Sequence, residues 1–213
     1  MKQTQAFLST YTADVSGVCS ALFELGGMTV MHDASGCNST YNTHDEPRWY
    51  DMDSLVFISG LSELEAVLGD DEKLIEDTVR AAKELSPRFI ALAGTPIPMI
   101  TGCDLAAIAR EIESRSGVPS SNGIGSYVSG AGQALRLYAE RFVLPAHEKK
   151  KNAVNILGAT PLDFSANGQV QSIARRLTEG GFSVQSVWAM GSETAAIDRA
   201  GEAEVNLVVS SVG

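Results

Sequence analysis

Two cysteines near the start of the chain, Cys19 and Cys37, have the type and spacing that most clearly point to chemistry. Cys37 ends the run Met31–Cys37 (MHDASGC), directly after a strand-like stretch, and Cys19 precedes it on a predicted helix. In a chain whose thiols stay reduced, such a pair favours a soft-metal or iron–sulfur site over a disulfide. The alternative is that both are small core residues, because free cysteine is often buried and neither belongs to a CxxC pair.

Histidines lie close to these cysteines in the sequence. His32 and His44 flank Cys37, so a mixed cysteine and histidine metal site is conceivable. A zinc site of that kind needs four closely spaced ligands, and this loop has no second cysteine. We therefore treat His32 as a secondary candidate for a metal ligand.

Predicted helix starts carry a third cysteine and an acidic pair. Cys103 precedes Asp104 at the start of one helix, and Asp70 and Asp71 precede another. A helix N-terminus would lower the pKa of the Cys103 thiol and make it reactive, whereas a buried or capping thiol would be inert. Asp70 or Asp71 is expected to cap its helix, since a carboxylate accepts hydrogen bonds from free backbone N–H groups.

The glycine-rich turn at residues 123–126 (GIGS) does not predict a nucleotide site. It lacks the third glycine of the dinucleotide fingerprint and the Lys-Ser/Thr pair of a P-loop. We interpret it as a helix-entry turn that needs small residues. The later turn Leu157–Pro161 is an equally weak signal. We expect that this chain binds no nucleotide.

The composition argues against several classes of function. The net charge of −10 and the lack of a Lys/Arg stripe argue against a nucleic-acid partner. No stretch approaches the roughly 18 apolar residues of a membrane span, and residues 1–13 lack the apolar core of a signal peptide. We therefore expect a soluble, cytoplasmic protein with no membrane partner.

Short apolar runs alternate with amphipathic stretches along the chain. The predicted strands are Met28–Met31, Ser54–Ser59, Phe89–Ala93, Ala153–Leu157, Ser183–Trp188 and Val205–Val209. The predicted helices are Asp71–Leu85, Asp104–Ser114, Ser129–Val143, Val170–Gly180 and Glu193–Ala200. This order is typical of an α/β protein built from Rossmann-like, three-layer domains with mainly parallel sheets.

A lysine-rich connector at residues 149–151 divides this pattern. We predict an N-terminal α/β domain over residues 1–148 and the start of a second Rossmann-like domain over residues 149–213. Because Gly213 follows a strand with no covering helix, the second domain is expected to be truncated. Ligands of parallel sheets gather at the carboxyl ends of the strands, which is where Cys37 is predicted to lie.

Three stretches together carry a resemblance to a known family. The first is the helix with Cys19, followed by a His-x-x-x-Gly-Cys run at residues 32–37; the second is Leu68–Leu74. The third is Thr95–Asp104. They resemble, in order, the first two cluster cysteines, a Phe-Gly-Gly-x-x-x-Leu run and a Cys-x-x-x-Leu-Ile-Gly-Asp-Asp run of the nitrogenase component 1 superfamily. That superfamily contains nitrogenase molybdenum–iron subunits, cofactor-assembly scaffolds and tetrapyrrole reductases.

The resemblance implies a cofactor, its ligands and its partners. Cys19 and Cys37 fall on the first two cluster-ligand positions, whereas the third position is Thr95, and Cys103 falls on the first acidic position. Two cysteines cannot complete the four-ligand set of a 4Fe-4S cluster. The cluster is therefore expected at the interface of a homodimer or with a related component 1 subunit. Electrons would come from a separate ATP-dependent iron–sulfur reductase, and the complex would act as an oxidoreductase on a small-molecule substrate.

Two other functions stay open at this point. The chain resembles cofactor-assembly scaffolds as well, which hold a cluster without turning over a substrate. It could also be a cluster-free α/β protein that binds a small molecule, with Cys19 and Cys37 as core residues. The replacement of the third cysteine by Thr95 favours this last alternative. The sequence identifies neither a catalytic residue nor the substrate.

Overall fold

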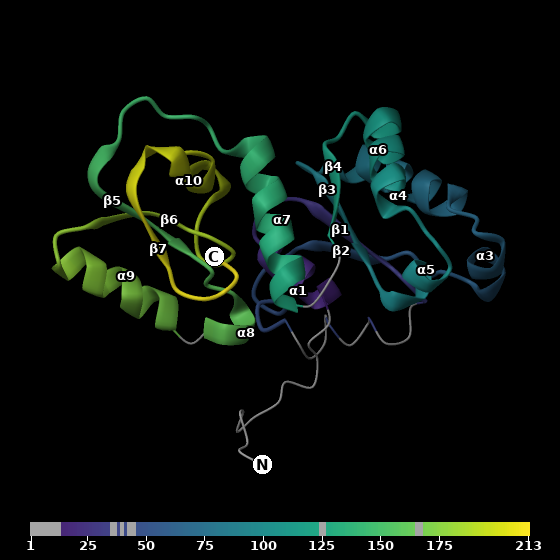
Figure 1. The fold of residues 1–213 in the computed structure, drawn as a ribbon, viewed down its shortest axis with the longest axis horizontal. Helices are drawn as coiled ribbons and strands as arrows, with labels where there is room; N and C mark the ends of the chain where they lie inside the picture. The colour runs from purple at the N-terminus through teal and green to yellow at the C-terminus, as the bar shows by residue number, and fades with distance from the viewer. Residues whose placement is uncertain (1–13, 35–37, 39–40, 42–45, 124–126, 165–167) are drawn as a thin grey trace, which may run out of the picture.

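The computed structural model describes residues 14–34, 38, 41, 46–123, 127–164 and 168–213, and contains two parallel β-sheets side by side (Figure 1). The first sheet has the strand order β2 (Leu55–Ile58), β1 (Met28–His32), β3 (Ile90–Gly94), β4 (Ser120–Gly123). The second has the order β6 (Ser183–Val187), β5 (Lys150–Leu157), β7 (Ala203–Val208). All neighbouring strands are parallel, so the predicted α/β fold with parallel sheets is confirmed.

Helices cover both faces of the first sheet. One face packs against α1 (Asp14–Leu22) and α7 (Tyr127–Phe142), and the opposite face packs against α4 (Glu72–Leu85) and α6 (Leu105–Ser116). Every residue of β1 and β3 is buried, as expected for parallel strands that are covered on both sides. We call these faces the α1/α7 face and the α4/α6 face.

The helices α1 and α7 lie between the two sheets (Figure 1). Their apolar cluster continues into the second half of the chain through Trp188 and Ile197. In the second sheet, α8 (Pro161–Phe164) and α9 (Gln169–Glu179) connect β5 to β6. The helix α10 (Thr194–Asp198) and the 3₁₀ turn η2 (Ala200–Glu202) connect β6 to β7. One apolar cluster therefore joins both sheets, and the division into domains at residue 148 stays a prediction.

Local signals explain why several elements begin and end where they do. Helix α4 buries apolar side chains at three- and four-residue spacing and ends at Leu85, with Ser86 as its C-cap directly before Pro87. Helix α3 (Glu63–Leu68) was not predicted, although its capping box, Ser62 with Glu65, is present in the sequence. Strand β4 was also missed, because its sequence, SSNG, reads as a turn.

The short helix α5 (Pro96–Ile100) follows β3 and was not predicted either. Its two prolines lie in the first turn, where backbone N–H groups have no partner within the helix and proline is tolerated. Among the described residues, no helix has the length and apolar character needed to cross a membrane.

Candidate functional site

Strands β1 and β3 end side by side, because His32 pairs with Gly94 in the register of the sheet. Thr95 follows at once; it is 4% exposed, and its hydroxyl donates to the carbonyl of His32 at 3.3 Å. A Cβ on Gly94 would lie 2.3 Å from Cδ1 of Leu105, so the start of α6 comes very close to the strand. This close approach brings Cys103, two residues before Leu105, to the carboxyl edge of the sheet.

The predicted site residues divide between the two faces of the sheet. Alternate residues of a strand point to opposite faces. Met28 and Val30 pack on the α4/α6 face, so His32 points to that face as well, and Cys103 packs there too. Cys19 lies in the cluster of the α1/α7 face. Cys19 and His32 are therefore close in the sequence but lie on opposite faces of the sheet.

Cys19 lies on α1, as predicted, and is completely enclosed. Its exposed fraction is 0%, and it belongs to the same apolar cluster as Met31 and Ala93. Burial raises the pKa of the Cys19 thiol far above its ordinary value, and the negative charge of Glu46 raises it further. In the chain as described, Cys19 is a neutral thiol in a dry core.

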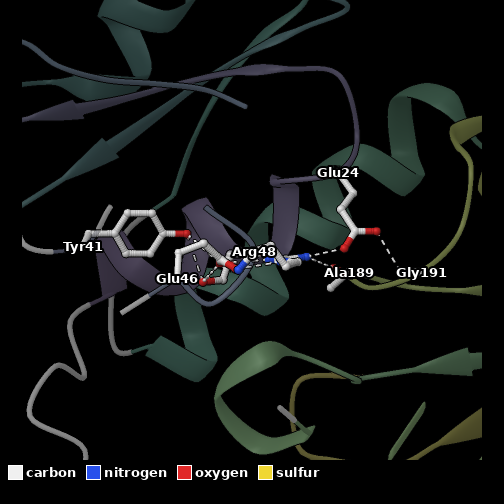
Figure 2. A network of polar contacts seen from close by, with 7 residues as sticks. Glu24, Tyr41, Glu46, Arg48, Ala189 and Gly191 are labelled. Carbon is white, nitrogen blue, oxygen red and sulfur yellow. Dashed lines mark hydrogen bonds and ion pairs between the residues drawn. The ribbon is translucent and has the colours of Figure 1, made fainter. Parts of the chain in front are cut away.

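Glu46 belongs to a buried polar network beside this core (Figure 2). Its carboxylate is 2% exposed and accepts hydrogen bonds from Ser20 Oγ at 3.0 Å and Tyr41 Oη at 3.0 Å. It also pairs with Arg48, whose Nε lies 2.7 Å from Oε1 of Glu46. Burial, with the nearby charge of Glu46, raises the pKa of the Tyr41 hydroxyl, which stays protonated and donates to the carboxylate.

Arg48 uses all five of its side-chain N–H donors. Two go to the Glu46 carboxylate and one to Glu24 at 2.7 Å. The other two go to the backbone carbonyls of Ser20 at 2.8 Å and Ala189 at 2.7 Å. Because a buried charge is tolerated only when it is paired and hydrogen-bonded, this set of partners explains how the guanidinium can lie in the core.

The network reaches from the first sheet to the turn after β6. Glu24 accepts a hydrogen bond from the N–H of Gly191 at 2.7 Å, and Arg48 holds the carbonyl of Ala189 (Figure 2). Ala189 has φ +75°, a conformation that is unfavourable for a residue with a side chain. Sequence reasoning missed Glu46 and Arg48; opposite charges on either side of Pro47 were the available signal.

Two predicted residues are not placed by the structure. Cys37 and His44 lie outside the described residues, as does the turn at residues 124–126. The role of Cys37 as a cluster ligand therefore stays a prediction.

A second group of potential ligands gathers on the α4/α6 face. A ring nitrogen of His32, a carboxylate oxygen of Asp71 and Sγ of Cys103 all lie within 4.8 Å of one another. Asp71 occupies the N-cap position of α4, yet its carboxylate makes no capping bond. Asp70 instead accepts from the N–H of Glu72 at 3.1 Å. The Asp71 carboxylate therefore does not take the expected capping role, and one of its oxygens lies within 4.8 Å of Sγ of Cys103.

The environment keeps both Cys103 and His32 neutral. Burial raises the pKa of the Cys103 thiol to about 12, and the carboxylate of Asp71 adds to this. The expected lowering of the Cys103 pKa by the start of α6 is therefore outweighed by burial and by the nearby carboxylate. Burial lowers the pKa of His32 below its ordinary value, although Asp71 opposes this shift.

This architecture has clear relatives. A family model described as nitrogenase component 1 type oxidoreductase matches residues 15–212. The chain belongs to this family. The match covers almost all described residues, so the resemblance inferred from the sequence is confirmed.

Two curated proteins are similar to this chain in sequence. It is 27% identical over 163 residues to the nitrogenase molybdenum–iron protein beta chain of Bradyrhizobium diazoefficiens, covering 69% of this chain and 31% of the relative. It is 25% identical over 162 residues to component CfbD of the Ni-sirohydrochlorin a,c-diamide reductive cyclase complex of Methanothermobacter thermautotrophicus, covering 70% and 43%. The chain thus spans less than half the length of these relatives.

Solved structures of nitrogenase Cp1 share the fold of this family member. The structure at pH 6.5 superimposes with a TM-score of 0.70 at 18% identity, covering 98% of this chain and 43% of the other. The structure at pH 5 gives 0.69 and 18%, with 98% and 44% covered. At this identity the likeness supports the fold alone.

Proposed function

We propose that the chain is a subunit of a component 1 type oxidoreductase that holds an iron–sulfur cluster with Cys19 and Cys37. The family match over residues 15–212 is the observation that carries this proposal. Cys19 is fully enclosed against the first sheet, so it would reach a cluster shared with another subunit only if this core opened during assembly.

Among the described residues, Cys19 supplies one of the four thiolate sulfurs that a 4Fe-4S cluster takes, and Cys37, the second proposed ligand, lies outside them. Thr95 stands at the third family position, but its buried hydroxyl is bonded to the carbonyl of His32. Cys103 packs on the opposite face of the sheet from Cys19. The remaining ligands of a 4Fe-4S cluster would therefore come from a second copy or a related subunit.

When bound, such a cluster supplies one-electron transfer. The chain's own contribution is to enclose Cys19 and to hold the charged side chains of Glu24, Glu46 and Arg48 in fixed positions beside it. Arg48 pairs with both Glu46 and Glu24, which holds these side chains in place beside Cys19.

The proposed partners follow from the same assignment. The sequence has no P-loop, so electrons would arrive from a separate ATP-dependent iron–sulfur reductase rather than from nucleotide hydrolysis in this chain. The substrate would be a small molecule bound by the complete complex. Residues 1–148 would form the cluster-binding domain, and residues 149–213 would form part of the next one.

A second candidate is a cluster-free protein that binds a small molecule. It is favoured by a hollow of about 440 Å³ between α7 and the second sheet, lined by Trp188, Asn155, Asn206 and Gly158 among others. That volume lies within the usual range of ligand pockets. In this alternative Cys19 is a core residue, as its complete burial also allows. A cofactor-assembly scaffold is the third alternative, distinguished by cluster binding without turnover.

Anaerobic cluster reconstitution tests the proposal. The purified wild-type chain, Cys19→Ser, Cys37→Ser and the matched control Cys103→Ser are incubated with iron and sulfide, then analysed for iron, acid-labile sulfide, visible absorption and size in solution. We expect about two iron atoms per chain in a wild-type dimer, as for one four-iron cluster shared by two chains. Each of the first two serine variants should lose most of the iron, and the control should keep it.

Other results would contradict specific parts of the proposal. Wild-type protein that stays free of iron and sulfide would overturn the cluster assignment. A cluster that survives both Cys19→Ser and Cys37→Ser, or that disappears in Cys103→Ser, would overturn the choice of ligands. Reconstituted protein that stays inactive with a reductase partner present would favour the scaffold.

A further inference from the structure

The group formed by His32, Asp71 and Cys103 has no part in the proposed cluster site. The group lies on the α4/α6 face, whereas Cys19 lies on the α1/α7 face of the same sheet. The three residues come from the end of β1, the N-cap of α4 and the residue before the N-cap of α6. They meet at the carboxyl edge of the sheet, where α/β proteins bind their ligands.

The imidazole of His32 is held by a neighbouring hydroxyl. Nδ1 of His32 lies 2.9 Å from Oγ of Ser59, and that hydroxyl donates to the carbonyl of Asp33 at 3.3 Å. With its proton used in this way, the Ser59 oxygen accepts from the Nδ1–H of His32. The lone pair is then on Nε2, which leaves this nitrogen able to bind a metal. Metal-bound histidines usually have such a partner on the second nitrogen.

The charges of the group suit a divalent cation. Asp71 and a deprotonated Cys103 carry two negative charges, and a neutral His32 adds none, so one M²⁺ ion neutralises the site. The displaced thiol proton passes to solvent. One sulfur, one nitrogen and one oxygen donor form a borderline set, which suits Zn²⁺ better than Mg²⁺ or Ca²⁺.

We propose that His32, Asp71 and Cys103 bind one Zn²⁺-like ion at a site on the opposite face of the sheet from Cys19. The fourth tetrahedral position is left for water or an external ligand, as in zinc sites with three protein ligands. Ligand atoms around a tetrahedral zinc lie about 3.4 Å apart for bond lengths near 2.1 Å. Since the three atoms already lie within 4.8 Å, side-chain rotations are enough to close the site.

Cobalt binding tests the proposal, because Co²⁺ takes the place of Zn²⁺ and a cobalt–thiolate bond absorbs in the near ultraviolet. The metal-free, reduced chain is titrated with Co²⁺ and then with Zn²⁺. We expect one Co²⁺ per chain with a thiolate charge-transfer band, and its loss as Zn²⁺ displaces the cobalt. Cys103→Ser should abolish the band, and His32→Gln and Asp71→Asn should weaken binding at least tenfold.

Matched variants separate this site from the proposed cluster. Cys19→Ser and Cys37→Ser should keep the cobalt band, and so should the exposed-histidine control His147→Gln. Ser59→Ala should keep the band but weaken binding about 10- to 100-fold, the usual effect of removing the group that hydrogen-bonds to a metal-bound histidine. Because Cys103 is only half-buried, Cys103→Ser is expected to fold, which circular dichroism checks.

Absence of stoichiometric cobalt binding, or a band that persists in Cys103→Ser, would overturn the proposal. A band that depends on Cys37 or Cys19 instead would assign the metal to those cysteines and overturn it as well. Iron–sulfur reconstitution and cobalt binding use different cysteines, so either proposal can fail without the other.

Discussion

Cys19 and Cys103 lie on opposite faces of one sheet, and their surroundings differ in kind. Cys19 is enclosed by apolar side chains and flanked by a network in which every charge has a partner. Cys103 is half-buried beside a histidine and a carboxylate that are not used to cap a helix. The pKa of both thiols is raised by burial, so pKa alone does not distinguish them. The two thiols differ in their exposure to solvent and in the polar side chains beside them.

The comparison teaches that one edge of a sheet can hold two environments for the same chemical group. A thiol in a closed core suits a site that is built when subunits assemble. A thiol among polar donors suits an ion that arrives from solvent. Three measurements test this difference, from the largest expected effect to the smallest.

The first measurement is thiol alkylation of the metal-free chain. In a Cys37→Ser background we expect Cys103 to react at least about 10³-fold faster than Cys19, because exposing Cys19 requires opening of the core. Mass spectrometry of the alkylated peptides over time measures both rates. Comparable alkylation rates of Cys19 and Cys103 in the native protein would show that the two thiols are equally accessible. In denaturant the two rates should become equal.

The second is the stability of Arg48→Ala. The change leaves Glu46 buried without its cation, so the free energy of unfolding should fall by about 3–5 kcal/mol. Urea unfolding followed by circular dichroism gives the value. Arg136→Ala is the control, since Arg136 forms an exposed i,i+4 pair with Glu140, and it should leave the unfolding midpoint unchanged. A loss below about 1 kcal/mol would mean that the ion pair contributes little to the stability of the core beside Cys19.

The third compares Cys19→Ser with Cys103→Ser in stability. A hydroxyl at position 19 enters a core with no solvent contact and should cost about 1–3 kcal/mol. At position 103 the hydroxyl can replace the thiol beside Asp71, so the loss should be below about 1 kcal/mol. The same urea titrations give both numbers. Equal decreases in the free energy of unfolding would indicate that positions 19 and 103 are equally shielded from solvent.

The fold was largely predictable because its strands and long helices carry strong patterns. β1, β3 and α4 were found to within about two residues at each end, as is usual for element boundaries. β4 was missed because an edge strand of Ser, Asn and Gly has no apolar period, and its pairing with β3 depends on tertiary contacts. The short helices α3 and α5 were missed because they hold too few residues to show a period.

The sites were only partly predictable. Sequence order put His32 beside Cys37, but the alternation of β1 turns His32 to the α4/α6 face, toward Cys103. Either Asp70 or Asp71 was expected to cap α4, and only the structure shows that Asp70 accepts the bond from the N–H of Glu72. Thr95, expected at a cluster position, is bonded to the backbone instead. Contacts between residues far apart in the chain decide each of these cases.

The hydrogen bond from Arg48 to the carbonyl of Ala189 spans 141 residues of sequence. At a ribosomal rate of roughly 5–20 residues per second, Ala189 emerges roughly 7 to 28 seconds after Arg48. Until then Arg48 lacks one of its five acceptors, and the apolar sides of α1 and α7 lack Trp188 and Ile197. We therefore expect the first half of the protein to complete its packing only after the second half has been synthesised.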